Sequence, residues 1–346
     1  MSELNPLTRY LPEIRARLAT AACACEWPEF ELQIARHLTQ TKLPPHVMLP
    51  LASAAAAGGE TRRALSAATA CALLSVAMRW FDDAQDRDRE ESLWRELGSG
   101  RAVNMAATAL SAAWRELAAD RELPKVALHA FGKHTIALAR GQDLDLQGGV
   151  ARTLNDYWRL MQGKTGAALA LACEVGALAA CPDKPAAEIC SRFGTHMGVL
   201  LQILDDLDGT FHPDGIGDLR AGKVTLPVLY GLAIDHPARD KLAKIVHGGS
   251  LAQHAEQVLQ ILEAIDTREF LVWSAFEERR QAIACLQGLP ATESGERQAG
   301  IAALIAYADL LMVGWETLLD RVDKPSRDRE VYARKQQEPT GQDAVV

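Results

Sequence analysis

Helix-forming residues fill most of this chain. Ala, Leu, Glu, Arg and Gln dominate, and runs of β-branched residues are scarce. This pattern favours helix nearly throughout, with breaks where Pro and Gly cluster. Such breaks fall at Pro44-Pro45, Gly58-Gly59, Gly148-Gly149, Pro182 with Pro185, and 212–218. Helices are expected over 8–24, 29–40, 45–57, 60–83, 101–119, 123–147, 153–180, 184–209, 223–235, 250–264, 267–288 and 296–322.

The helical pattern continues without a low-complexity linker or a fixed-period repeat. The expected fold class is therefore all-α, with one large helical domain over residues 1–322. From Asp323 onward the chain reads "DKPSRDREVYARKQQEPTGQDAVV", which is polar. We expect this tail, residues 323–346, to be partly disordered because it offers little apolar surface to bury.

Composition narrows the class of protein. The net charge is −8, so the chain has no basic footprint for nucleic acid or for an anionic membrane. Met1 to Leu18 shows no signal-peptide pattern, and no uncharged apolar run reads as a membrane span. The seven cysteines are scattered in apolar surroundings, which indicates reduced buried thiols in a cytoplasmic protein, with neither a disulfide framework nor a zinc site.

An apolar stretch ends abruptly in carboxylates at "VAMRWFDDAQD", residues 76–86. Asp82 and Asp86 are four residues apart, so they stand on one helix face, with Asp83 beside them. Like charges at this spacing weaken a helix unless a cation lies over them. Magnesium fits, because it prefers carboxylate oxygens and commonly shares them with substrate phosphates.

A second stretch of the same kind is "GVLLQILDDLD", residues 198–208, where an apolar run ends in Asp205 and Asp206, followed by Asp208. One such cluster alone reads equally well as a solvated helix end. Two clusters that both close apolar helices favour the functional interpretation. Facing each other, they would hold metal ions bound to a diphosphate.

Two lysines lie in short polar motifs. "QGKTG", residues 162–166, contains Lys164 and Thr165; it is not a P-loop, because position 158 is Trp where that motif needs Gly. By itself Lys164 reads as a surface lysine. "DLRAGKVTLP", residues 218–227, supplies Lys223, and "GQDLDL", residues 141–146, adds Gln142 and Asp145. Lysine suits phosphate oxygens as a point charge.

Taken in order, DDAQD, GQDLDL, the segment from Tyr157 to KTG, GVLLQILDD and DLRAGKVTLPVLYGL resemble the trans-isoprenyl diphosphate synthase, or polyprenyl synthetase, family. The resemblance covers residues 40 to 320. It implies an all-α isoprenoid synthase bundle around a deep central cavity, three magnesium ions, an allylic diphosphate substrate and a homodimer.

The resemblance also implies roles for residues that match the family motifs. Asp82 and Asp86 would ligate two magnesium ions with Asp83 beside them, and Asp205 would ligate the third, supported by Asp206. The diphosphate would be bound by Lys164, Thr165, Gln202 and Lys223. These metals and lysines would stabilise charge on the departing diphosphate.

The sequence departs from the family pattern in three places, two of them at the site for isopentenyl diphosphate. Leu43 and Pro44 stand where the family has a basic pair for isopentenyl diphosphate, unless Lys42 takes that role. Glu91 and Ser92 stand where it has an arginine pair. In the second aspartate motif Gly209 takes the place of the last Asp, although Asp205 and Asp208 can still share a helix face.

The sequence therefore predicts a magnesium-dependent enzyme that ionises an allylic diphosphate and transfers its prenyl group, with ordinary chain elongation first. The degraded isopentenyl diphosphate site leaves two alternatives open, a terpene synthase or cyclase and a prenyltransferase to a non-diphosphate acceptor. A non-catalytic subunit of a heteromeric synthase is a further alternative, which the intact aspartates oppose.

Overall fold

The computed structural model describes residues 5–40, 45–86, 92–146, 153–212, 217–291 and 294–315. This part of the chain is all-α and contains no strand, as the sequence predicts. The helices form two compact units. The single-domain expectation for residues 1–322 and the central cavity stay predictions, and the tail 323–346 lies outside the described residues.

The first unit comprises residues 1–136, 168–194 and 283–310. It contains α1 (Asn5–Thr8), α2 (Leu11–Cys23), α3 (Pro28–Gln40), η1 (Pro45–Met48), α4 (Leu49–Ala56), η2 (Thr61–Ala64), α5 (Leu65–Asp86), α6 (Leu93–Leu97) and α7 (Ser99–Ala119). It also includes parts of α8 (Lys125–Leu146), α10 (Ala167–Ala180), α11 (Lys184–Phe211), α16 (Thr267–Leu286) and α17 (Gly295–Met312).

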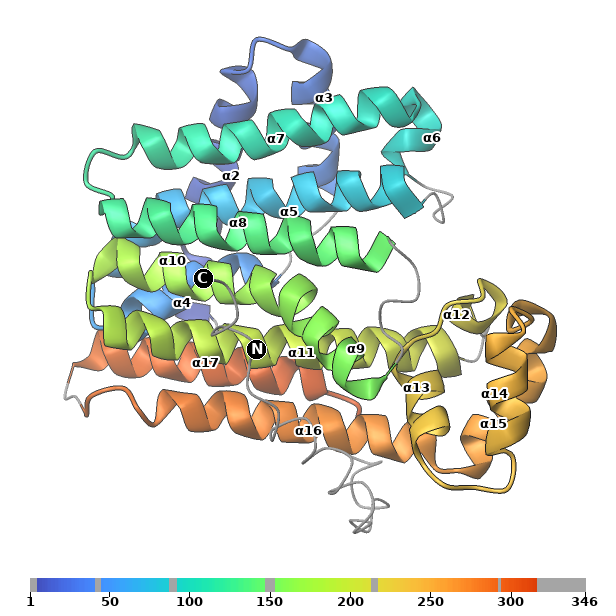
Figure 1. The fold of residues 1–346 in the computed structure, drawn as a ribbon. Coiled ribbons are helices and arrows are strands. Elements are labelled where there is room, and N and C mark those ends of the chain that lie inside the picture. Colours follow the sequence, from blue (N-terminus) through green and yellow to red (C-terminus); the bar gives the residue numbers. More distant parts are fainter. Residues whose placement is uncertain are drawn as a thin grey trace, which may run out of the picture. The chain divides into compact units, whose positions relative to one another are not determined.

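Helix α5 is a core element of the first unit and packs along α7 (Figure 1). Its inner face is rich in alanine, including the fully buried Ala67, Ala70 and Ala77, so neighbouring helices can approach closely. Near its end Trp80 packs edge-on against Phe30 at a centroid distance of 6.1 Å. Among the described helices, only the segment Thr61–Gln85 is long and apolar enough to cross a membrane, and 78% of its most apolar window is buried. Core packing thus accounts for its apolar character.

The second unit comprises residues 137–167, 195–282 and 311–346. Besides parts of α8, α11 and α16 it contains α9 (Leu154–Met161), the π-helix η3 (Gln162–Gly166), α12 (Gly217–Arg220), α13 (Leu226–Ala233), α14 (Arg239–His247), η4 (Ala252–His254) and α15 (Ala255–Ala264). Helix α13 packs against α9, α14 and α15 (Figure 1). Its Tyr230 stacks on Phe270 of α16 with an interplanar angle of 12°.

The predicted helices agree with most of the described ones, with three instructive differences. Helix α14 was not predicted because its segment "RDKLAKIVH" is short and largely polar. The stretch 153–180, predicted as one α-helix, contains the π-turn η3. The last predicted helix, 296–322, ends at Met312, shortly before Gly314 adopts a φ of +93°.

All seven cysteines are free thiols. Cys71, Cys173 and Cys190 are buried in the first unit, and burial raises the pKa of Cys71 and of Cys190 to about 12. The expectation of buried thiols is wrong for Cys23, which is exposed at the end of α2.

Candidate functional site

The first aspartate cluster lies in the last two turns of α5, in the first unit. Asp83 is buried, Asp82 is half-buried, and the side chain of Asp86 lies outside the described residues. Carboxylates at this end of a helix meet the negative end of its dipole, which destabilises them. A cation bound there would relieve both this effect and the repulsion between neighbouring carboxylates, so the donor set fits magnesium.

Lys164 lies in the π-turn η3 in the second unit. A π-turn inserts one extra residue into a helix and is frequent at functional sites. The Lys164 ammonium donates a hydrogen bond to Oδ2 of Asp145 on α8 over 2.6 Å. The sequence motifs QGKTG and GQDLDL, which lie on different helical elements, are therefore in contact.

Close backbone approach holds η3 against α11. A Cβ atom added to Gly198 would lie 2.3 Å from the carbonyl oxygen of Thr165 and 2.5 Å from the Cα of Gly166. Only glycine fits there, because real Cβ atoms do not come so close to backbone atoms. The tight packing lets the short Thr165 side chain reach α11, where its hydroxyl donates to Oε1 of Gln202 over 2.8 Å.

Asp206 is the centre of a buried hydrogen-bond network in the second unit, with an exposed fraction of 2%. Its carboxylate accepts hydrogen bonds from Nε2 of Gln202 over 3.1 Å, from the backbone amide of Leu226 over 3.2 Å and from the hydroxyl of Tyr157. Burial raises the pKa of Asp206 to about 7 even though these donors lower it. The network joins α9, η3, α11 and the start of α13.

The contribution of Tyr157 was missed at the sequence level. Tyr157 appeared there only as a landmark before the KTG motif, without a role. It is buried, and burial together with the neighbouring Asp206 raises the pKa of its hydroxyl well above the ordinary value. A neutral hydroxyl remains a hydrogen-bond donor to the buried carboxylate.

Lys223 is positioned by the end of α12. The amide of Lys223 donates to the carbonyl of Asp218 over 2.9 Å, and the amide of Gly222 donates to the carbonyl of Leu219 over 3.0 Å. With Gly222 at a φ of +75°, this is a Schellman motif, which favours glycine at the left-handed position. The lysine that follows is exposed, with its ammonium 4.0 Å from Oδ1 of Asp218.

The remaining residues of the second aspartate motif differ in exposure. Asp205 and Asp208 are both exposed, whereas Asp206 between them is buried. Within the second unit hydrogen bonds thus connect Thr165, Gln202 and Asp206, while Lys164, next to Thr165 in the chain, bonds to Asp145. Lys42, Leu43, Pro44 and Glu91 lie outside the described residues, and Ser92 directly precedes α6.

Among the residues that the structure describes, no three His, Cys, Asp or Glu side chains are grouped to hold a metal ion by themselves. In phosphate-processing sites a magnesium ion commonly keeps several waters and takes one or two carboxylates plus oxygens of the substrate.

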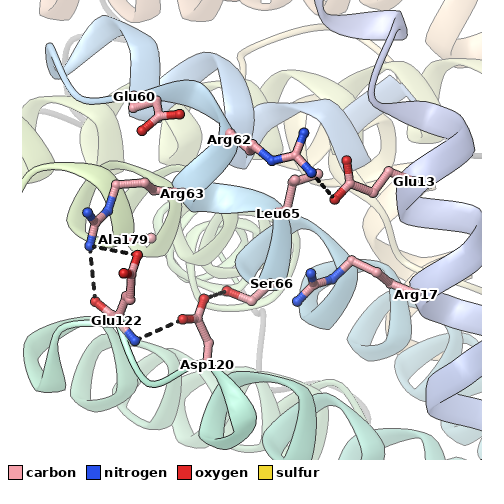
Figure 2. A pocket seen from close by; sticks show the side chains of 10 residues that line it. All are labelled: Glu13, Arg17, Glu60, Arg62, Arg63, Leu65, Ser66, Asp120, Glu122 and Ala179. Carbon is pink, nitrogen blue, oxygen red and sulfur yellow. Dashed lines mark hydrogen bonds and ion pairs between the residues drawn. The ribbon is translucent and has the colours of Figure 1, made fainter.

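A charged hollow of about 270 Å³ lies in the first unit, near the start of α5 (Figure 2). Its arginines are paired with acidic neighbours: Arg62 with Glu13 over 2.9 Å, and Arg63 with Glu122 over 3.6 Å. Asp120 accepts a hydrogen bond from the Ser66 hydroxyl over 2.6 Å. The charges here connect helices to one another, so the hollow does not resemble a diphosphate site.

Comparison with known proteins decides the family. The family model described as "Polyprenyl synthetase" matches residues 40–265, which is more than half of the chain. The chain belongs to the polyprenyl synthetase family. It is a prenyltransferase of isoprenoid biosynthesis, a class that uses isoprenoid diphosphates together with a divalent metal ion.

Individual relatives agree with this assignment. This polyprenyl synthetase is 30% identical over 248 residues to the (2E,6E)-farnesyl diphosphate synthase of Mycobacterium tuberculosis, covering 67% of this chain and 69% of that protein. It is also 30% identical over 211 residues to the geranylgeranyl diphosphate synthase of the same organism, covering 57% of this chain and 60% of that one.

Solved structures show the same fold. A decaprenyl diphosphate synthase from Rhodobacter capsulatus matches with a TM-score of 0.77 and 20% identity, over 91% of this polyprenyl synthetase and 99% of that chain. A polyprenyl synthase from Caulobacter crescentus, solved with calcium and isoprenyl diphosphate, matches with a TM-score of 0.73 and 20% identity, over 88% and 97% of the two chains. The predicted isoprenoid synthase fold is confirmed.

Proposed function

We propose that this protein is a magnesium-dependent prenyl diphosphate synthase that ionises an allylic isoprenoid diphosphate and transfers the prenyl group to isopentenyl diphosphate. The observation that supports it best is the continuous hydrogen-bonded path from Thr165 through Gln202 and Asp206 to the amide of Leu226. This path joins three motifs that the sequence predicts to act on the diphosphate.

In this proposal Asp82, Asp86 and Asp205 ligate three magnesium ions, with Asp83 and Asp206 in supporting positions. Magnesium, when bound, supplies positive charge to the departing diphosphate. Asp205 is exposed and so is accessible to a hydrated ion, whereas the buried Asp206 holds the surrounding elements in place. In this proposal the two adjacent aspartates thus have different tasks.

The two lysines bind the diphosphate oxygens. The bond between the first carbon of the prenyl group and the diphosphate oxygen breaks, and its electron pair leaves with the diphosphate. The double bond of isopentenyl diphosphate then adds to the allylic cation, and the cation formed loses a proton to the released diphosphate. Lys164 and Lys223 stabilise the negative charge that develops there. In the structure each lysine lies near a carboxylate, Asp145 or Asp218, which holds the ammonium until an anion competes for it. Thr165 and Gln202 line the same site.

The test is diphosphate release from the purified protein with magnesium and geranyl, farnesyl or geranylgeranyl diphosphate, each with and without isopentenyl diphosphate. Longer prenyl chains that form only with isopentenyl diphosphate would support the proposal. Asp205→Asn should lower the rate about 100-fold, because a catalytic metal loses a ligand. Asp235→Asn, an exposed aspartate of the same unit, is the matched control and should leave the rate unchanged.

A second candidate function rests on the sequence of the isopentenyl diphosphate site. Leu43, Pro44, Glu91 and Ser92 replace the basic residues that the family uses to bind this second diphosphate. A terpene synthase or cyclase, or a transferase to a non-diphosphate acceptor, needs only the allylic site. Consumption of an allylic diphosphate alone, with a hydrocarbon or alcohol as product, would establish the terpene synthase or cyclase. Absence of turnover with every mixture would favour another acceptor or a non-catalytic subunit.

We also propose that the protein forms a homodimer. The resemblance to the polyprenyl synthetase family supports it. Ile136 of α8, 65% exposed, and Val103 of α7, 39% exposed, are apolar side chains on the surface of the first unit where a partner could be tested. Light scattering on the wild type should give twice the monomer mass, and Ile136→Lys should shift it toward the monomer. The exposed Lys241→Glu on α14 is a control that should remain dimeric.

A further inference from the structure

A second hollow in the first unit is lined by the first turns of α8 and α11 and by the last turns of α10. Its volume is about 420 Å³, which is within the range of pockets that hold small ligands. In Figure 1 these helix ends lie at the opposite end of the first unit from the carboxyl end of α5, which carries Asp82 and Asp83. The hollow is therefore separate from the aspartates of α5.

Lysines gather at this hollow, which we call the lysine hollow. Lys125, Lys133 and Lys184 line it, and they are all the lysines that the structure describes in the first unit. His129 lies between the first two in sequence, and the spacing of four residues puts Lys125, His129 and Lys133 on one face of α8. Basic side chains are thus concentrated at one place on a chain whose net charge is −8.

One of these lysines is fixed by a carboxylate. Both carboxylate oxygens of Glu174 accept hydrogen bonds from the Lys133 ammonium, over 2.9 and 3.0 Å. The side chains of Lys125 and Lys184 form no ion pair or hydrogen bond with any residue that the structure describes. Glu188 is the only other carboxylate of the lining. Two exposed ammonium groups therefore remain available to an anion, beside a third that Glu174 holds in place.

Two helix N-termini add to this positive charge. Helix α8 begins at Lys125 and α11 at Lys184, and neither helix has an acidic residue in its first turn. Asp183 directly precedes α11 but does not line the hollow. The amino end of a helix carries a partial positive charge, which favours a bound anion. An anionic group between the two lysines would thus be stabilised by both helix ends.

The remaining lining is apolar. Leu178 is 4% exposed, Ala130 3% and Ala187 2%, and Val126 is half-buried. A small inorganic ion would use the lysines and would not cover these side chains. The combination of exposed ammonium groups and buried apolar groups suits a ligand with an anionic head and an apolar body.

We propose that the lysine hollow binds an amphipathic organic anion, an isoprenoid phosphate or diphosphate, at a second site apart from the aspartates of α5. Ammonium groups suit phosphate oxygens, and the small apolar side chains suit a prenyl chain. The family to which this chain belongs acts on compounds of this kind. Binding at this site needs neither magnesium nor turnover, so it does not depend on the proposed function.

Calorimetry on the full chain in the presence of EDTA tests this site, with geranyl monophosphate, inorganic phosphate and geraniol as probes. EDTA removes the metal ions through which the aspartates would bind a phosphate. Geranyl monophosphate should bind at least about tenfold more tightly than inorganic phosphate, because burial of only two of its carbons contributes that much. It should also bind at least about tenfold more tightly than geraniol, which has no charge.

Paired lysine variants locate the binding. Lys125→Gln/Lys184→Gln should weaken the binding of geranyl monophosphate about tenfold, because the loss of one hydrogen bond to a charged group has an effect of this size. Lys241→Gln/Lys244→Gln removes two exposed lysines of α14 and should bind like wild type. A thermal melt and light scattering on each variant check its fold and its oligomeric state.

Several results would overturn the assignment. Equal affinity for geranyl monophosphate and inorganic phosphate would show a simple anion site, and equal affinity for geraniol would show that charge is irrelevant. If Lys164→Gln/Lys223→Gln weakens binding and Lys125→Gln/Lys184→Gln does not, the probe occupies the proposed diphosphate site instead. A change of Lys125→Gln/Lys184→Gln from dimer to monomer would show that these lysines contact a second copy of the chain.

The two proposals can fail separately. If geranyl monophosphate binds in EDTA as expected but no allylic diphosphate turns over with magnesium, the lysine hollow stands and the proposed function falls. If turnover with magnesium is observed and nothing binds in EDTA, the proposed function stands and the lysine hollow falls.

Discussion

The backbone amide of Leu226, the first residue of α13, donates a hydrogen bond to Oδ2 of Asp206 on α11 over 3.2 Å. A buried carboxylate thereby satisfies one of the amides that a helix start leaves without an intrahelical partner. The segment that directly precedes this amide carries Lys223 and Thr225. Asp206 therefore fixes the start of α13, three residues after Lys223 of the GKVTLP motif.

Asp206→Ala should lower the free energy of unfolding by about 3 kcal/mol, since it leaves the donors of Gln202, Tyr157 and Leu226 buried without their acceptor. Urea unfolding measures this change. Asp208→Ala, two residues away and exposed, should change it by no more than about 0.5 kcal/mol. Equal effects of the two substitutions would contradict a scaffolding role for Asp206.

Gly198→Ala should destabilise the protein by about 2 kcal/mol, because the added methyl group meets the backbone of Thr165 and Gly166. It should also raise the KM for the allylic diphosphate, because moving η3 away from α11 would break the hydrogen bond between Thr165 and Gln202. Gly163→Ala is the matched stability control. Nothing lies within 4 Å of a Cβ added there, so the melting temperature should stay or rise.

Substitutions at Gly222 should follow the tolerance of each residue for a positive φ. Gly222→Ala should cost about 1 kcal/mol and Gly222→Asn less, because Asn adopts the left-handed conformation more readily than Ala. Because Lys223 directly follows Gly222, the KM for the allylic diphosphate should rise more in Gly222→Ala than in Gly222→Asn. An Ala variant with unchanged KM would show that the turn does not position Lys223.

Acid stability should depend on Glu174 of α10. Burial raises the pKa of this carboxyl, but hydrogen bonds from His134 and Lys133 outweigh that effect and lower the pKa to about 2. A carboxyl with a lowered pKa in the folded state stabilises the protein at neutral pH, and this contribution is lost as the pH falls from about 4.5 to about 2.

Thermal melts between pH 2 and pH 7 measure this contribution. Glu174→Gln should be less stable than wild type at pH 7, and the difference should shrink steadily below pH 4.5. Glu188→Gln, an exposed carboxyl on α11 of the same unit, serves as the control and should follow the wild-type profile. A constant difference between wild type and Glu174→Gln at every pH would show that the charge of Glu174 does not matter.

The fold class could be predicted from the sequence, because helix composition is a local signal. The motif order singled out Lys164, Thr165, Gln202 and Asp206 as candidates, and it gave Tyr157 no role. The hydrogen-bond partners could not be predicted, since they depend on tertiary packing. The residues next to Asp206 in the sequence do not indicate that it is buried while Asp205 is exposed. They also do not indicate that its carboxylate accepts a hydrogen bond from the amide of Leu226, twenty residues further along.

Gly209 is a second case in which the sequence does not predict a tertiary contact. At the sequence level it reads as a lost ligand, because the motif is compared position by position along one helix. The carboxylate beside it comes from Asp218 on α12, a separate element. A deficit in one motif and an acidic residue nine positions later are related only in three dimensions.

The π-turn at Gln162–Gly166 makes this segment unusually sensitive to chain length. An α-helix turns by about 100° per residue. The one extra residue of the π-turn therefore sets the direction in which the side chains of α9, which precedes the turn, point around the helix axis. Deleting a single residue there would restore a regular helix and would turn Tyr157 by that angle around the axis, away from Asp206. Point substitutions in this turn can be absorbed by local rearrangement, whereas a one-residue deletion changes which side chains of α9 face the carboxylate.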